Sequence, residues 1–428
     1  MKFWGALCLS SWVMPPPPQP PLTGNNGAVL VETVSPSAVV PMTGRSASTT
    51  TASPLLQQGI ASFLVAATSS SQSSSSSPPS KADVQLLRQA FAEFYGVNRD
   101  LTKSEELLSA VIELWAGQPD DERAALYRVR GDCYTLLADA DRAYADYDTA
   151  IQLLTTSKVG QSQADPAELP AALLGRARAL VGKTNGYNNQ LTPAAAQRAA
   201  ADYQQYLKLT SREEWDTEAE LIEDGATRNP YAAWEWGSAL RRAGQYEAAT
   251  QAHALAATAF GEIGDKARSV MALLDAGIDA AAGGKVEEAS SLLRRAIAQT
   301  PGVSSRDVAL LQRVIAKEGQ GRLALAALLW DTPGDGKAQA EQVLGDACVR
   351  LEQMQAQQQQ SSKKSSSSSS SSPATSDTPA TGLRFSMDDV LPDAMDVSCY
   401  KFKSPTFLDQ LGWPEELQRK VIKLETLR

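Results

Sequence analysis

Histidine, cysteine and aromatic residues are scarce in this chain. One histidine, His253, and four cysteines occur among 428 residues, and only 6% of the residues are aromatic. A single histidine excludes the paired histidines of HExxH metal sites and of His-Cys zinc fingers. Four scattered cysteines are too few for a disulfide-rich secreted scaffold. We therefore expect neither a metal site nor another cofactor.

Long apolar runs and an excess of basic residues are also lacking. No stretch approaches the roughly 18 apolar residues of a membrane helix, so we expect no integral membrane span. The chain carries 49 acidic residues against 40 Lys and Arg, which gives a net charge of -9. Phosphate binding requires a basic face, so we expect no nucleic-acid partner.

The first 80 residues contain almost no charge and consist mainly of Ser, Thr, Pro, Ala and short apolar runs. Such a stretch buries too little apolar surface to offset the entropy of ordering it. An acid-poor, Ser-rich N-terminus is typical of an organelle transit peptide, and the apolar islands at 3–14 and 59–67 resemble two successive signal cores. The prediction for 1–80 is a leader that suits a plastid protein sent on to the thylakoid lumen. The alternative is a disordered tail without an address.

A second low-complexity stretch separates the end of the chain from its middle. Residues 356–382 include runs of glutamine and of serine, a composition that predicts a flexible spacer. The predicted domains are therefore a folded part at 81–355 and a C-terminal segment at 383–428.

Helix-forming residues dominate from 81 to 355, and apolar residues recur there at spacings of three and four. Two stretches align without a gap, RAYADYDTAIQL at 142–153 and RAAADYQQYLKL at 198–209. They share Arg, two Ala, Asp, Tyr and the final Leu. An internal repeat of this kind predicts stacked helical pairs, and so an all-α solenoid.

The order of small and bulky residues resembles the tetratricopeptide repeat, which has a small residue at position 8 and a bulky one at position 24. Segments that start at 124, 230 and 270 fit this pattern. Their residues at positions 8 and 24 are Gly131 and Tyr147, Gly237 and His253, and Gly277 and Leu293. The small residue lets the two helices of a pair approach, and the bulky one fills the gap between them.

The resemblance covers roughly 81–329 and implies a helical-hairpin solenoid. A fourth copy near 173–209 and degenerate pairs at 84–115 and 307–329 complete the prediction. Gly283-Gly284 and Gly319-Gln320-Gly321 are expected at turns between the helices of a pair.

The last residues resemble the end of plastid tetratricopeptide-like proteins of plants and algae. Those proteins close with a Cys/Tyr, a Phe- or Trp-Leu pair, and an Arg-Trp-Pro-Pro-like motif before a last helix. Here the sequence from 399 reads CYKFKSPTFLDQLGWPEE, without the Arg and the second Pro. The resemblance implies a C-terminal capping helix, with Trp413 docked on the last pair and closing the end of the solenoid. It also places Cys348 and Cys399 in two parts of the cap, where a disulfide and two separately buried thiols are the alternatives.

The candidate partner-binding residues occupy positions that face the groove in tetratricopeptide repeats. They are Arg128, Asp132, Tyr231, Trp234, Ser238, Arg241 and Arg242. A tryptophan beside two arginines is typical of a protein-contact hot spot, although one tryptophan here would otherwise pack between repeats. Asp132 stands where carboxylate-clamp members carry Asn, and it would repel the carboxylate of a chaperone tail.

These residues predict a non-enzymatic protein-binding scaffold. His253 falls at a packing position, and the pattern supplies no partner that would make it a general base. The resemblance implies a role in the assembly, maintenance or stable membership of a photosynthetic complex, whose subunits would be the partners, with peripheral thylakoid association. The alternatives are a cytosolic co-chaperone-type adaptor and a regulatory subunit of an enzyme.

Overall fold

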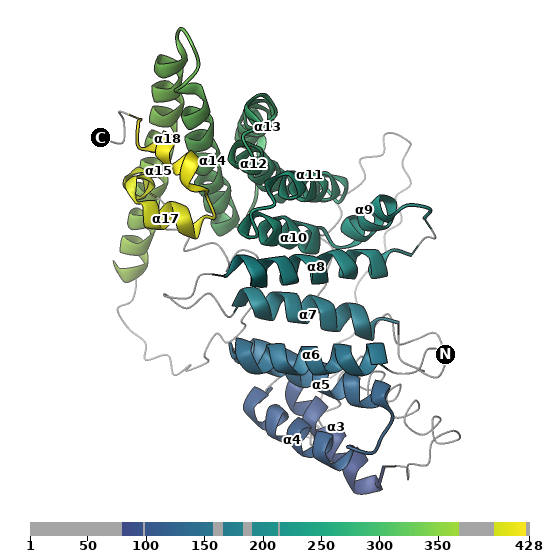
Figure 1. The fold of residues 1–428 in the computed structure, drawn as a ribbon. Helices are drawn as coiled ribbons and strands as arrows, with labels where there is room; N and C mark the ends of the chain where they lie inside the picture. Colours follow the sequence, from purple (N-terminus) through teal and green to yellow (C-terminus); the bar gives the residue numbers. More distant parts are fainter. Residues whose placement is uncertain are drawn as a thin grey trace, which may run out of the picture.

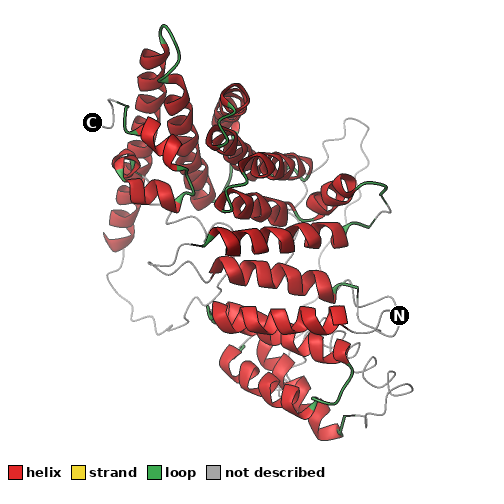
Figure 2. Ribbon diagram, viewed as in Figure 1, coloured by secondary structure: helices red, strands yellow, loops and turns green. Residues whose placement is uncertain are grey.

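The computed structural model describes residues 79–96, 99–156, 166–182, 191–212, 215–367 and 398–424, with side chains of the last long helix described to 356. Every regular element in these ranges is a helix (Figures 1 and 2). Nearly all of the predicted leader at 1–80 and most of the predicted spacer at 356–382 lie outside the described residues.

The described helices form antiparallel hairpins that pack on one another in chain order (Figure 1). The hairpins are α3 (Lys81–Tyr95) with α4 (Leu101–Leu114), α5 (Asp120–Leu136) with α6 (Ala140–Thr156), α7 (Glu168–Gly182) with α8 (Pro193–Thr210), α10 (Pro230–Arg242) with α11 (Tyr246–Glu262), α12 (Lys266–Ala282) with α13 (Val286–Gln299), and α14 (Val308–Leu329) with α15 (Gly336–Ser367). We call the earlier member of each hairpin its first helix. The predicted all-α solenoid is confirmed.

Three shorter parts complete the described chain. Helix α9 (Glu218–Arg228) is inserted between the third and fourth hairpins, and the 3-10 turn η2 (Thr300–Gly302) follows α13. The C-terminal residues form η4 (Cys399–Lys403), α17 (Pro405–Gln410) and α18 (Glu415–Val421). Figure 1 shows that the helix axes turn gradually, from lying across the view at α5–α8 to running up it at α14 and α15.

Close approach at glycine holds three hairpins together, as the spacing predicted. A Cβ atom added at Gly131 would lie 3.0 Å from the Tyr147 ring, and one at Gly237 would lie 2.5 Å from the His253 ring. The α12/α13 hairpin repeats this arrangement with Gly277 and Leu293. Because each glycine and its bulky partner are sixteen residues apart, the packing rule is local to a hairpin.

The predicted last pair at 307–329 is wrong, because these residues form the single helix α14, which begins at the N-cap Asp307. Gly319 and Gly321 lie inside this helix and not at a turn. A Cβ at Gly321 would lie 2.6 Å from Leu274 Cδ2 of α12, and one at Gly319 would lie 3.0 Å from Leu351 Cδ1 of α15. These glycines therefore mark close approach to two neighbouring helices. The predicted turn at Gly283-Gly284 is confirmed.

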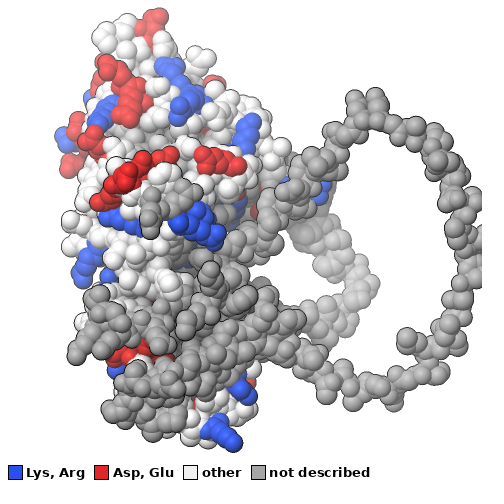
Figure 3. Space-filling model, turned by 90° about the vertical axis from the view of Figure 1, so that its right-hand side faces the viewer, with Lys and Arg blue, Asp and Glu red and all other residues white. Residues whose placement is uncertain are grey.

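The apolar core is continuous along the later hairpins and includes the C-terminal segment. A separate cluster fills α3, α4 and the adjoining side of α5. On the face shown in Figure 3, acidic and basic side chains are interspersed. Among the described helices none is long and apolar enough to cross a membrane.

Candidate functional site: an ion-pair ladder and its C-terminal cover

Ion pairs join each first helix to the next from α5 to α14. We call this row of contacts the first-helix ladder. Its pairs are Arg128–Glu168 at 2.7 Å, Arg178–Glu235 at 2.9 Å, Arg241–Asp275 at 2.9 Å and Lys317–Asp275 at 3.0 Å. Every member of the ladder has a side chain that is at most 16% exposed. Paired charges screened from water in this way fix the position of one hairpin on the next.

A second set of ion pairs lies within the hairpins. The Arg130 guanidinium donates to both carboxylate oxygens of Asp146, which joins α5 to α6. Arg176 makes the same two-pronged contact with Asp202 and so joins α7 to α8. Bidentate arginine–carboxylate contacts fix orientation as well as distance, so they lock the angle between the two helices.

The ladder is densest where α10, α11, α12 and α14 meet. Asp275 accepts hydrogen bonds there from the Trp234 indole at 2.9 Å, from Arg241 at 2.9 Å and from Lys317 at 3.0 Å. The neighbouring carboxylate, Asp279, accepts from Arg241 and lies 2.5 Å from Nδ1 of His253. We call these six residues the buried charge cluster: Trp234, Arg241, His253, Asp275, Asp279 and Lys317.

Burial and opposite charge compete in this cluster. Burial alone would raise the pKa of the Asp275 carboxyl, but the Lys317 and Arg241 charges outweigh it and hold that pKa well below its usual range. Burial lowers the pKa of the Lys317 ammonium, and the nearby Asp275 charge offsets only part of the effect. Asp275 is therefore ionised whenever the protein is folded near neutral pH.

Ser238, His253 and Asp279 are hydrogen-bonded in the order that a serine hydrolase uses. Ser238 Oγ lies 3.4 Å from Nε2 of His253, whose Nδ1 contacts Asp279. The surroundings do not suit nucleophilic catalysis, because Ser238 lies inside α10, where backbone N–H groups are used by the helix and cannot form an oxyanion hole. His253 is completely buried. The hydrogen bonds from Ser238 and Asp279 therefore hold the His253 ring in a packed core.

The structure places most of the predicted groove residues inside the array. Trp234 is 2% exposed, Arg241 is 9% exposed and Arg128 is 8% exposed, and each makes the internal contacts described above. Trp234 also packs edge-on against Phe260, as expected for a tryptophan between repeats. These three side chains offer little surface to a partner in this arrangement.

The remaining groove candidates are partly accessible. Asp132 accepts from Arg128 at 2.6 Å and from the Tyr147 hydroxyl at 2.7 Å, and burial raises the pKa of its carboxyl. The Tyr231 ring lies under the Arg268 guanidinium. Arg242 is half-buried, and its burial beside Arg241 lowers its pKa.

The repeat pattern did not point to the acceptors and the buried lysine of the ladder or to the second carboxylate of the buried charge cluster. They are Glu168, Glu235, Asp275, Lys317 and Asp279. One signal was present, because the apolar stretch MALLDAGIDAAA at 271–282 carries two aspartates four residues apart. Charged residues inside an otherwise apolar helix are seldom fully buried unless they are paired, so their partners had to be sought on other helices.

The C-terminal residues 398–424 form a cover over the first-helix side of the last hairpins. Helix α18 contacts both α14 and α12, and η4 contacts α15. A Cβ at Gly412 would lie 3.3 Å from Arg241 Cδ, so the cover also reaches α10. Trp413 is 3% exposed and belongs to the main apolar core. The segment thus docks on the last hairpin, as the resemblance implied, but it extends along the side of the array toward α12 and α10.

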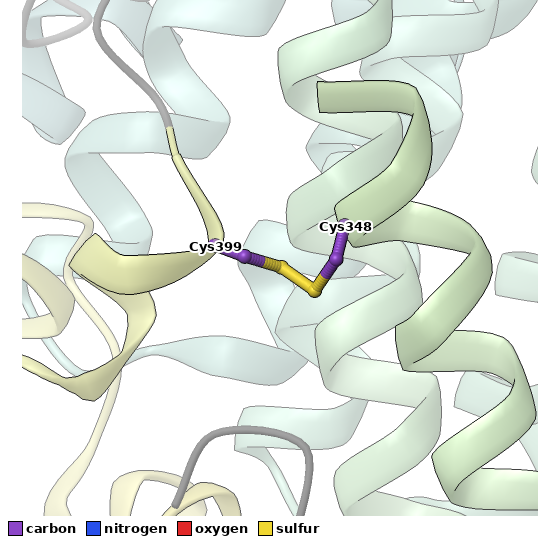
Figure 4. The surroundings of a disulfide bond; sticks show 2 residues. All are labelled: Cys348 and Cys399. Atoms are coloured by element: carbon purple, nitrogen blue, oxygen red, sulfur yellow. A yellow bond between two sulfur atoms is a disulfide. The ribbon is translucent and has the colours of Figure 1, made fainter. Parts of the chain in front are cut away.

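A disulfide anchors the start of this cover. Cys348 of α15 and Cys399 of η4 are bonded, with their Cα atoms 5.2 Å apart (Figure 4). Of the two alternatives drawn from the sequence, the structure has the disulfide. Cys133 is a free thiol, completely buried in α5.

One open hollow of about 590 Å³ lies beside the buried charge cluster. It is lined by the turn between α10 and α11, the start of α11 and the last turn of α12. The exposed pair Lys285–Glu247, 2.5 Å apart, stands on its rim. Within the described residues, no group of three or more His, Cys, Asp or Glu side chains is placed to hold a metal ion.

Comparison with known proteins gives no family. No protein-family model matches this chain, and no curated protein matches it. Among solved structures, the crystal structure of BtubC (BKLC) from P. vanneervenii is similar at 16% sequence identity and a TM-score of 0.38. The match covers 65% of this chain and 97% of that one. A similarity of this size carries no argument about fold or function.

Proposed function

We propose that this protein is a non-enzymatic scaffold that binds other proteins along its solenoid. The observation that carries this proposal is the first-helix ladder, which ties five successive first helices into one framework. A surface that is already ordered loses little conformational freedom when a partner binds, so more of the contact energy appears as affinity.

The setting we propose is the plastid, where the partners would be subunits of a photosynthetic complex. The acid-poor leader at 1–80 and the resemblance of the C-terminal segment to plastid tetratricopeptide-like proteins support this setting. The Cys348–Cys399 disulfide favours an oxidising compartment such as the thylakoid lumen. Mass spectrometry of the mature N-terminus tests the import: retention of residues 1–80 in the cell would rule it out and favour a cytosolic adaptor.

The partner surface is tested by affinity purification of the protein from its own cells. Trp234 and Arg241 are buried, so we propose the open hollow beside them as the partner surface. The informative variant changes two exposed residues that line this hollow, Gln251→Glu with Lys285→Glu. A matched control, Arg294→Glu with Arg295→Glu, alters exposed charge on α13. We expect the first variant to lose its partner and the second to keep it. Equal recovery by both variants would move the site away from the hollow.

A hydrolase is the second candidate, and only the order Ser238–His253–Asp279 favours it. A fluorophosphonate probe separates the two functions, because it labels an activated serine. We expect no labelling of the folded protein. Labelling that disappears in Ser238→Ala would establish the hydrolase and overturn the scaffold proposal.

A further inference from the structure

The C-terminal cover is a separate element seated on the array. Its core residues are large and apolar, and they are at most 8% exposed: Phe402, Phe407, Leu408, Leu411, Trp413, Leu417, Val421 and Leu424. Gln418 organises the cover internally by donating to Asp409 at 2.6 Å and to the Trp413 carbonyl at 2.9 Å. Besides the disulfide, the contacts between the cover and the array include apolar packing and two outer lysine contacts.

Two opposing effects act on the docking of this cover. Burial of its apolar side chains favours docking, and the entropy lost when a whole segment is ordered opposes it. The indole N–H of Trp413 is buried without an acceptor among the described residues, which weakens docking further. The disulfide spans 51 residues, and closing a loop of that length favours the docked state by about a thousandfold.

Reducing agents can reach this bond. Cys348 and Cys399 are both half-buried, and their neighbours Val349 and Tyr400 are 52% and 78% exposed. Cys133 differs in every respect, because burial raises the pKa of its thiol to about 12 and no solvent reaches it. Attack by a thiolate requires access to a sulfur, so reduction acts at the cover and spares the core.

We propose that the faces of α12 and α14 beneath the cover are an interaction surface gated by the Cys348–Cys399 disulfide. A dithiol reductant supplies two electrons and two protons, the S–S bond breaks to give two thiols, and the reductant becomes a disulfide. The cover then leaves, and the surface binds a segment of another protein. The hollow used in the proposed function is a different surface, so either proposal can fail without the other.

The C-terminal cover, which now occupies the surface, indicates the kind of partner that the surface would bind. The site accepts an amphipathic segment with an aromatic anchor, as Trp413 and the apolar face of α18 now provide. Asp331, just beyond α14, lies 3.8 Å from Lys420 and 3.4 Å from Lys423. The partner is therefore an aromatic, amphipathic helix with lysines on its outer side.

The test measures binding of a labelled peptide to the full-length chain. The peptide is residues 398–424 with Cys399→Ser, and fluorescence anisotropy compares oxidised protein with protein reduced by dithiothreitol. The reduced chain is expected to bind the peptide at least tenfold more tightly, because its own tethered segment competes only at an effective concentration of about a millimolar. The same peptide with Trp413→Ala should not bind.

A vacated chain provides the control for the surface itself. Full-length protein with Cys399→Ser and Trp413→Asp should bind the peptide with or without reductant. Failure of this variant to bind, while hydrogen exchange shows α14 folded, would overturn the interaction surface. Equal binding by the oxidised and reduced wild type would overturn the proposal that the disulfide controls access to this surface. A reduced protein that dimerises in sedimentation would replace the foreign partner with a second copy of this chain.

Discussion

The α5/α6 and α10/α11 hairpins solve the same packing problem with different chemistry. In each, a glycine of the first helix receives the ring of a residue sixteen positions later, Tyr147 in one and His253 in the other. The Tyr147 hydroxyl donates to Asp132 of its own hairpin. The His253 ring contacts Asp279, which belongs to the next hairpin.

This difference shows that one packing position can serve either a hairpin or the array. The hydroxyl contacts of Tyr147 stay within its own hairpin, although its ring also packs against Gly175 of α7. Around His253 the polar contacts join three hairpins through the buried charge cluster. The neighbours in a solenoid supply much of each repeat's stability. We therefore expect α10–α14 to unfold as one unit and α5/α6 to respond more independently.

Removal of a carboxylate should give the largest difference in stability between the two hairpins. Asp275→Ala leaves Arg241 and Lys317 buried without their shared partner, so we expect the free energy of unfolding to fall by about 3–5 kcal/mol. Asp132→Ala should cost only about 1–2 kcal/mol, since Arg128 keeps Glu168. Urea denaturation measures both values. Equal losses would show that the two hairpins are stabilised alike.

Adding a methyl group at the position-8 glycines compares how tightly the His253 and Tyr147 rings are confined. Gly237→Ala places Cβ 2.5 Å from a His253 ring that is held on both sides, and we expect a loss of about 1–3 kcal/mol. Gly131→Ala meets the Tyr147 ring at 3.0 Å and should cost less. Thermal unfolding followed by circular dichroism ranks the two variants. The reverse order would mean that the Tyr147 ring is the more tightly confined.

Removal of the Tyr147 hydroxyl tests whether that contact is local. Tyr147→Phe deletes hydrogen bonds to Thr135 and to the Asp132 carboxylate, which retains Arg128, so we expect a loss of about 1–2 kcal/mol. Hydrogen exchange should detect faster opening in α5 and α6 and no change in α12. Faster exchange in α12 would show that this hairpin, too, is coupled to distant ones.

The two carboxylates should also respond to acid in opposite directions. Asp275 has a folded pKa below the ordinary aspartate value of 3.8, so its stabilising effect is complete above about pH 4 and is lost as the pH falls further. Asp132 has a raised folded pKa, so its ionisation destabilises the fold as the pH rises above 3.8. Urea midpoints at pH 3, 4 and 5 check both signs. Asp275→Asn should flatten the acid loss, and Asp132→Asn should steepen it slightly.

The hairpins could be predicted from the sequence because their rules are local. Gly131 and Tyr147 are separated by a fixed number of residues within one hairpin, so their contact follows from spacing alone. The pairing of Arg241 with Asp275 depends on how one hairpin sits on the next. The way one hairpin sits on the next could not be predicted from the sequence because the hairpins are unequally spaced. Gly237 and Gly277 are forty residues apart, and α9 interrupts the array earlier.

The candidate site was predicted only in part for the same reason. Positions that face a groove in a regular repeat face the next hairpin here, which turned Trp234 and Arg241 into internal residues. Gly319 and Gly321 resembled a turn, yet they serve a close approach between helices. The two cysteines could be named from the C-terminal motif, but the path of the cover across α14 and α12 required three dimensions.

The disulfide also changes the covalent connectivity of the chain. Cys348 and Cys399 close a ring that contains every peptide bond between them. A protease that cuts once inside this ring produces two fragments that migrate together until a reductant is added. The disulfide would then be the covalent link between the C-terminal piece and α15. The cover would therefore stay in place even after the peptide chain that leads to it has been cut.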